Sequence, residues 1–237
     1  MSARFAGRVV LVAGAGTGVC RATAVAFARE GATVMVAGPD PDELAGTVKL
    51  IRDAGGAADS VTADLTRGGS DAAVRMVAET VERYGALDIA FNNATVTGPN
   101  RHVADIQEAD WAQTLAGNLT GVWMAMKHEL AHMEARGAGV IVNTSCDMAA
   151  TGRLVGMGAY AASKAALSAL TRTAAHEYIA KGIRINAISP GPAHGAKPGE
   201  TGGATAEEVA ETVVWLCSDE ASFVVGHDMV LDKKTVV

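Results

Sequence analysis

Tyr160 and Lys164 lie four residues apart in a segment of helical period. On a helix this spacing places both side chains on one face. A tyrosine with its usual pKa of about 10 is a poor acid–base group at neutral pH, whereas a neighbouring ammonium stabilises the phenolate and lowers that pKa. The pair is therefore suited to donating a proton to a carbonyl oxygen.

A second chemical feature is a glycine-rich stretch, AGAGTGVC, at residues 13–20. It follows an apolar run and opens a segment of helical period, so its glycines allow a tight turn. Such a turn brings backbone N–H groups and the positive end of the helix against a pyrophosphate. The placement predicts a dinucleotide site, and the alternative is that these are ordinary turn and packing glycines.

These groups must be positioned by elements that alternate along the whole chain. Short apolar runs and longer segments of helical period predict a single α/β domain over residues 1–237, with a parallel sheet, helices on both faces and right-handed crossovers. The expected strands are residues 8–13, 32–37, 57–64, 87–93, 139–145, 183–189 and 227–232. The expected helices lie near residues 18–30, 41–54, 69–84, 105–136, 158–181 and 205–218.

Composition argues against several other classes of protein. The formal charge is −6 and the basic residues form no run, which argues against a nucleic-acid partner. The three cysteines, Cys20, Cys146 and Cys217, are far apart and form no CxxC, which fits a reducing compartment. Since no apolar segment approaches the length of a membrane span, we expect a cytoplasmic protein with a small-molecule substrate and no membrane partner.

Several motifs occur in a fixed order along the chain: Gly14, Gly16 and Gly18 in the first loop, Asn92-Asn93-Ala94, the pentad from Tyr160 to Lys164, and Ser-Pro-Gly-Pro at 189–192. On these motifs the chain resembles the short-chain dehydrogenase/reductase family, over nearly its whole length. The resemblance implies a Rossmann-type, doubly wound parallel sheet of about seven strands, usually in a homotetramer or homodimer.

The resemblance also implies an activity, the transfer of a hydride between the nicotinamide of NAD(P) and a carbonyl or secondary alcohol. We favour a ketoreductase acting on a bulky or secondary-metabolite substrate. The alternative is a related protein with a non-redox activity, such as a cyclase, dehydratase or isomerase, or a catalytically weakened binding partner.

Roles for individual residues follow from the same resemblance. Tyr160 is the expected acid–base, Lys164 also holds the nicotinamide ribose, and Asn118 supports a water-mediated proton relay. The residues expected to line the cofactor are Gly14, Gly16, Thr17, Gly18, Val19, Gly38, Asp64, Leu65, Asn92, Asn93, Ala94, Tyr160, Lys164, Pro190, Gly191 and Ala193.

The choice between NAD(H) and NADP(H) usually depends on the end of the second strand, where an acid binds the ribose 2′-hydroxyl and a base meets the 2′-phosphate. This chain has Gly38-Pro39-Asp40 there. The glycine resembles NADP-preferring members, and Pro39 removes their usual cation. The sequence gives a slight preference for NADP(H).

The serine that usually contacts the substrate oxygen is substituted. Alignment by the fifth strand places Cys146 at that position, whereas counting back from Tyr160 places Asp147 there. A thiol is a weak donor, and an ionised carboxylate only accepts hydrogen bonds. Cys146 is the first candidate, and Ser145 is a possible substitute.

Two further departures bear on the site. Cys20 replaces a glycine of the family's first loop. The substrate loop, residues 190–205, is shorter than usual, which leaves the site more open, and it carries His194.

A competing motif is HELAH, residues 128–132, which matches the H-E-x-x-H zinc signature on an expected helix. It explains only five residues and lacks a third ligand, so we expect no metal and read it as a polar helix face or a subunit contact.

Overall fold

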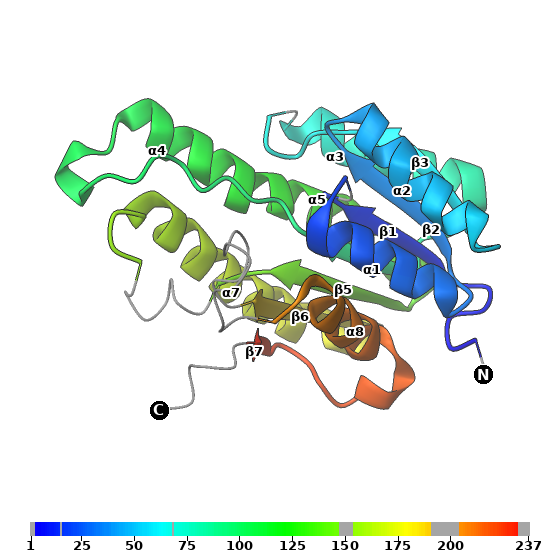
Figure 1. The fold of residues 1–237 in the computed structure, drawn as a ribbon. Coiled ribbons are helices and arrows are strands. Elements are labelled where there is room, and N and C mark those ends of the chain that lie inside the picture. Colours follow the sequence, from blue (N-terminus) through cyan, green and yellow to red (C-terminus); the bar gives the residue numbers. More distant parts are fainter. Residues whose placement is uncertain (1–2, 15, 68, 147–153, 191–203, 232–237) are drawn as a thin grey trace.

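The computed structural model describes residues 3–14, 16–67, 69–146, 154–190 and 204–231. Within them, seven parallel strands form one sheet in the order β3-β2-β1-β4-β5-β6-β7 (Figure 1). The strands are β1 (Val9–Ala13), β2 (Thr33–Gly38), β3 (Ala57–Thr62), β4 (Ile89–Asn92), β5 (Gly139–Thr144), β6 (Ile183–Pro190) and β7 (Asp228–Leu231). The order reverses between β1 and β4, so a crevice for ligands is expected at the carboxyl ends of these strands.

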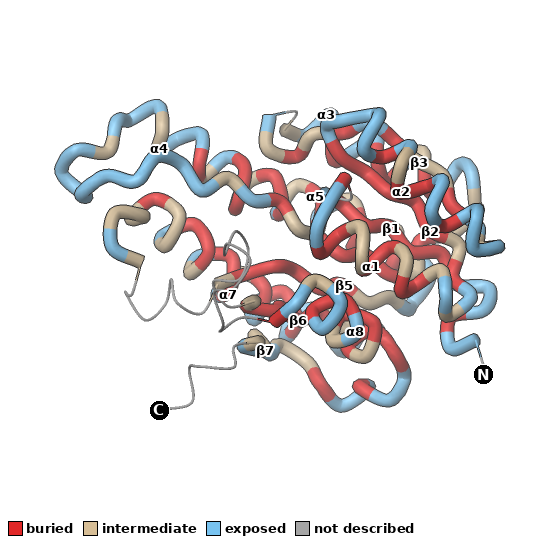
Figure 2. Tube along the Cα trace, viewed as in Figure 1, coloured by how far each residue is buried: buried red, intermediate tan, exposed pale blue. Residues whose placement is uncertain are grey.

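Helices cover both faces of the sheet, as the alternating pattern predicted. One face carries α1 (Gly18–Arg29), α2 (Pro41–Asp53) and α8 (Ala206–Cys217), which share one core cluster. The other carries α3 (Gly69–Tyr84), α5 (Val122–Arg136) and α7 (Gly158–Tyr178), which share a second cluster. Figure 2 shows the buried layer between them. The doubly wound, Rossmann-type sheet is confirmed.

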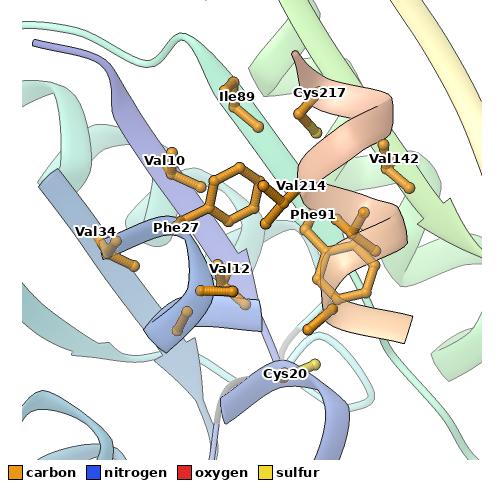
Figure 3. Packing of buried hydrophobic residues seen from close by; sticks show 14 of the residues in the cluster. Val10, Val12, Cys20, Phe27, Val34, Ile89, Phe91, Val142, Val214 and Cys217 are labelled. Carbon is orange, nitrogen blue, oxygen red and sulfur yellow. The ribbon is translucent and has the colours of Figure 1, made fainter. Parts of the chain in front are cut away.

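The first cluster shows why β1 is apolar along its whole length. Val10 and Val12 point to the α1 and α8 face, where Phe27 and Val214 meet them (Figure 3). Leu11 points to the opposite face and joins the second cluster. A central parallel strand is buried on both sides, so neither set of alternating positions is polar.

The region expected as one helix over residues 105–136 is interrupted. It contains a short 3-10 turn at Val103–Asp105, α4 (Glu108–Leu115), a π-helical turn at Ala116–Gly121, and then α5. A Cβ at Gly117 would lie 2.6 Å from the Val96 side chain, and a Cβ at Gly121 would collide with the carbonyl oxygen of Leu65. The two glycines thus allow the wider turn to pack closely against the loops after β3 and β4.

Most of the predicted substrate loop, including His194, lies outside the described residues. Before it, β6 ends at Pro190, and after it α8 begins with a capping box between Thr205 and Glu208. None of the helices in the described ranges has the length and apolar character needed to cross a bilayer.

Candidate active site

The side chain of Lys164 is fully buried where β4, β5 and α7 meet. Its Nζ donates to the carbonyl oxygens of Ala94, at 3.0 Å, and Thr144, at 2.8 Å. Burial lowers the pKa of Lys164 to about 8, while the nearby Cys146, Asp228 and Cys20 act in the opposite direction. The two carbonyl groups provide the hydrogen bonds that a buried ammonium requires.

Tyr160 is half-buried one helical turn before Lys164, and the Lys164 Nζ lies 5.9 Å from the centre of its ring. The pKa of Tyr160 is raised, first by burial and then by the neighbouring Cys146. The sequence suggested the opposite direction, a phenol made more acidic by Lys164. In the structure the ammonium is instead directed to the two backbone carbonyls.

The structure distinguishes between the side chains that could take the place of the substituted serine. Cys146 follows β5, and its side chain hydrogen-bonds with that of Tyr160. The hydroxyl of Ser145 is buried and lies 3.1 Å from the Lys164 carbonyl oxygen and 3.2 Å from Ser168 Oγ. Ser145 therefore contacts α7 rather than the Tyr160 hydroxyl, and Asp147 lies outside the described residues.

Asn118 is buried in the π-helical turn. Its Oδ1 accepts from the Val96 N–H at 2.6 Å, and its Nδ2 donates to the Val96 carbonyl at 2.8 Å and to Ser163 Oγ at 3.0 Å. Ser163 in turn donates to the Tyr160 carbonyl at 2.7 Å. The asparagine is thereby connected to the helix of Tyr160 through a serine of the same pentad, whose role the sequence reading missed.

The glycine loop has the features that a pyrophosphate requires. Gly14 has a φ of 89°, and a Cβ there would lie 2.6 Å from the carbonyl oxygen of Asn93. Gly18 begins α1 with a φ of 56° and has open space where a Cβ would stand. Thr17 caps α1 without a side-chain hydrogen bond, and the first turn holds no acid. The N–H groups at this helix end are thus suited to an anion.

Cys20 occupies the family's glycine position without closing this loop. Its buried thiol contacts the Ala13 carbonyl at 3.6 Å, and Asn93 Nδ2 donates to it at 2.9 Å. Burial raises the pKa of Cys20 to about 12, so the thiol is a packing group rather than a nucleophile. It joins α1 to the segment after β4.

The remaining cofactor candidates that the structure describes lie at the same edge of the sheet, at or near the ends of the strands. Gly38 ends β2 and Pro190 ends β6. Asp64 follows β3, and its Oδ1 accepts from the Thr66 N–H at 2.8 Å and hydroxyl at 2.6 Å. Leu65, Val19 and Ala94 are buried. Gly191 and Ala193 lie outside the described residues.

Two carboxylates lie at the start of α2, the helix that follows β2. The Glu43 carboxylate lies against Gly16, where it would collide with a Cβ. Asp40 caps α2 by accepting from the N–H groups of Asp42, at 2.9 Å, and Glu43, at 3.1 Å. Arg21 donates to the Gly16 carbonyl at 2.5 Å, so its guanidinium is already engaged.

The HELAH segment forms part of α5, and no group of metal-ligating side chains occurs among the described residues. Glu129 is fully buried and accepts from Asn92 Nδ2 at 3.0 Å. A separate cluster joins the end of β6 to the start of β7. Asp228 accepts there from Ser189, at 2.6 Å, and from Ser168.

A cavity of about 430 Å³ opens at the opposite edge of the sheet, where β4, β5 and β6 begin. Arg184, which lines it, donates to the carbonyls of Leu216, Ser218 and Ala221. Tyr160, Lys164 and the glycine loop lie at the carboxyl edge. The candidate active site is therefore at that edge, despite the size of this cavity.

Comparison with known proteins agrees with this geometry. The family described as short chain dehydrogenase matches residues 8–198. The chain is 36% identical to cis-4-hydroxycyclohexanecarboxylate dehydrogenase of Sinomonas cyclohexanicum, over 98% of each protein. It is 39% identical to the A-factor type gamma-butyrolactone 1'-reductase (1S-forming) of Streptomyces virginiae, over 95% of this chain and 94% of that protein.

Solved structures give the same result. The crystal structure of a short chain dehydrogenase from Mycobacterium smegmatis superimposes with a TM-score of 0.89 at 32% identity. It covers 99% of this chain and 95% of that one.

The raised pKa of Tyr160 generates a prediction for the protein without cofactor. Because burial disfavours the phenolate, Tyr160 should carry its proton below about pH 10. Ultraviolet titration of tyrosinate, taken as wild type minus Tyr160→Phe, should show no ionisation at neutral pH. A component that titrates near pH 7 in this difference would contradict the structure.

Proposed function

Because the chain belongs to the short-chain dehydrogenase/reductase family of NAD(P)-dependent enzymes, we propose that it transfers a hydride between nicotinamide and a carbonyl or secondary alcohol borne on a ring. The observation that carries the proposal is the convergence of Tyr160, Lys164 and Asn118 beside the glycine loop. The names of the two relatives, one a cyclohexane alcohol dehydrogenase and one a lactone 1'-reductase, support a bulky ring-bearing ketone.

The cofactor would be held along the carboxyl edge of the sheet. The α1 end with Gly14, Gly16, Thr17, Gly18 and Val19 would bind the pyrophosphate, and the other lining positions are Gly38, Asp64, Leu65, Asn92, Asn93, Ala94, Pro190, Gly191 and Ala193. When bound, the nicotinamide supplies or accepts the hydride. The chain must then orient the substrate and manage one proton.

Tyr160 is the proposed proton donor to the carbonyl oxygen in reduction. Its protonated state in the free protein suits this direction. Lys164, with two carbonyl partners, would hold a cofactor ribose and stabilise the phenolate that remains after proton transfer. Asn118, bonded to Val96 and Ser163, would support the path by which Tyr160 regains its proton.

Cys146 is the proposed substrate-facing group in place of serine. Its contact with Tyr160 supports this assignment, whereas the buried contacts of Ser145 with α7 favour a structural role for that serine. A thiol donates a weaker hydrogen bond than a hydroxyl, so it stabilises developing charge on the substrate oxygen less.

The charged side chains near the glycine loop bear on the cofactor preference more directly than Gly38 does. Glu43 places negative charge beside Gly16, Asp40 caps the start of the same helix, and Arg21 is engaged with backbone and with Thr47. A 2′-phosphate would meet these carboxylates, and Arg21, the cation described beside Gly16, already donates to the Gly16 carbonyl and to Thr47. A 2′-hydroxyl could instead donate to one of the carboxylates. We therefore propose NAD(H) as the preferred cofactor, against the slight preference for NADP(H) drawn from the sequence.

We also propose a homodimer or homotetramer. Trp111 on α4 and Trp123 on α5 are both large, apolar and exposed. Such side chains are typical of surfaces that are covered by another subunit.

The central test of the activity is Tyr160→Phe. Loss of the hydroxyl should reduce turnover of a ring ketone at least ~10³-fold while the dissociation constant for NADH stays within about threefold of wild type. Tyr178→Phe, on the same helix, is the matched control and should turn over normally. Full activity in Tyr160→Phe would overturn the assignment.

Cys146→Ser separates a weakened oxidoreductase from the non-redox alternative. A hydroxyl at this position should raise kcat for ketone reduction by about 10-fold or more, because one oxyanion donor is commonly worth ~10²–10³. Cys217→Ala removes a distant thiol and should leave kcat unchanged. No gain in Cys146→Ser, with NADH still bound, would favour the cyclase, dehydratase or isomerase alternative.

Glu43→Gln tests the cofactor preference. Wild type should bind NADH at least about tenfold more tightly than NADPH, and the substitution should improve NADPH binding because it removes a like charge. Fluorescence titration with both cofactors measures this, with the exposed Glu82→Gln on α3 as control. Equal or tighter binding of NADPH by wild type would show that the carboxylate does not select the cofactor.

A further inference from the structure

The acidic residue of the HELAH segment has a role that the hydride-transfer site does not explain. Glu129 points away from solvent, toward the sheet, and its side chain is fully buried. Its Oε2 accepts from Asn92 Nδ2, which also donates to Asn143 Oδ1 at 3.2 Å. A buried carboxyl on a helix is costly unless its oxygens find partners.

Two atoms of this pair lack partners. Glu129 Oε1 and Asn92 Oδ1 are both buried, and neither has a hydrogen-bond partner among the described residues. An ionised carboxylate and an amide oxygen are both acceptors, so they cannot satisfy each other. A neutral carboxylic acid has an O–H donor, and it could bond the amide oxygen while its other oxygen accepts from Nδ2.

The electrostatic surroundings favour the neutral form as well. Burial raises the pKa of Glu129 to about 7, and the Asn92 hydrogen bond opposes this only in part. Among the residues that the structure describes, no charged side chain shifts that pKa. The ionisable groups on or beside the elements packed near Glu129 are Asp71, Arg75, Glu79, Glu82, Arg83 and Tyr84 on α3, Asp88 before β4, Lys164 on α7, and Lys127, His128, His132, Glu134 and Arg136 on α5 itself.

Asn92 is the last residue of β4 and begins a turn with several contacts to the active site. Asn93 donates to Cys20 under the glycine loop, and the backbone carbonyl of Asn93 limits position 14 to glycine. The carbonyl oxygen of Ala94 accepts from Lys164 Nζ. A displacement of Asn92 would therefore move both the pyrophosphate loop and the lysine.

We propose that Glu129 is a positioning residue that acts as a neutral carboxylic acid, with its proton bridging Oε1 to Asn92 Oδ1 and so fixing the Asn92–Ala94 turn. Ionisation breaks this bridge, because two acceptors then face each other in a buried site. As the pH rises from about 4.5 to about 7, the folded state is destabilised relative to the unfolded state, since the folded carboxyl retains its proton to higher pH.

Glu129→Gln is the informative variant because its amide reproduces both bonds of the neutral acid without a titratable proton. Glu129→Leu removes both bonds, and Glu134→Gln on the exposed side of α5 is the control. Infrared difference spectra of wild type minus Glu129→Gln at about pH 6 should contain the carbonyl band of a protonated carboxylic acid. This band should disappear on titration through about pH 7.

Melting and cofactor binding test the positioning role. Wild type and Glu129→Gln should melt alike near pH 5, whereas at about pH 8.5 the Gln variant should melt higher and bind NADH about tenfold more tightly. Glu129→Leu should bind NADH weakly at both pH values. The infrared and melting measurements need no cofactor, so they separate this proposal from the proposed hydride transfer.

Three results would overturn the proposal. These are a carboxylate band for Glu129 at pH 6, a melting difference between wild type and Glu129→Gln that does not vary with pH, and NADH binding by Glu129→Gln with the same pH profile as wild type. The last result alone, with the infrared band present, would reject the positioning role while leaving the neutral acid.

Discussion

The candidate active site depends on the burial of one ammonium group. Lys164 cannot remain inside the protein unless its Nζ finds acceptors, and it finds them in the carbonyl oxygens of Ala94 and Thr144. These carbonyls follow or end neighbouring strands, so one side chain joins α7 to β4 and β5. These contacts direct the ammonium to backbone carbonyls, while the ring of Tyr160, one helical turn away, is centred 5.9 Å from Nζ. Burial and the neighbouring Cys146 raise the pKa of Tyr160, so the phenol should keep its proton in the free protein.

Polar pairs around this lysine hold the strand ends in place. Asp228, at the start of β7, joins the end of β6 to α7 through Ser189 and Ser168, and Ser145 extends the cluster to the end of β5. On the other side Glu129 holds Asn92 at the end of β4. The hydrophobic layers position the elements, and these buried polar contacts position the strand ends to which the reacting groups belong.

Much of this architecture could be predicted from the sequence, because its signals are local. Buried apolar strands, the glycine loop and the Tyr160–Lys164 spacing each depend on neighbouring residues only. The π-helical turn at Asn118 was missed because it depends on the close packing of Gly117 and Gly121 against distant loops. The direction of the Tyr160 pKa and the bond between Glu129 and Asn92 likewise depend on partners that only the fold brings together. The contact between the Glu43 carboxylate and Gly16 could not be predicted either, because it depends on how α2 packs against the glycine loop.

The most direct test of the central claim is to follow the hydride itself. The protein would be incubated with a cyclohexanone carboxylate and with NADH deuterated at the transferable position of the nicotinamide, and the alcohol would be examined by mass spectrometry. The account predicts one deuterium, bound to the carbon that carried the carbonyl group, and a product hydroxyl whose proton comes from solvent through Tyr160. Formation of an unlabelled alcohol, or of a product without any change in oxidation state, would contradict it.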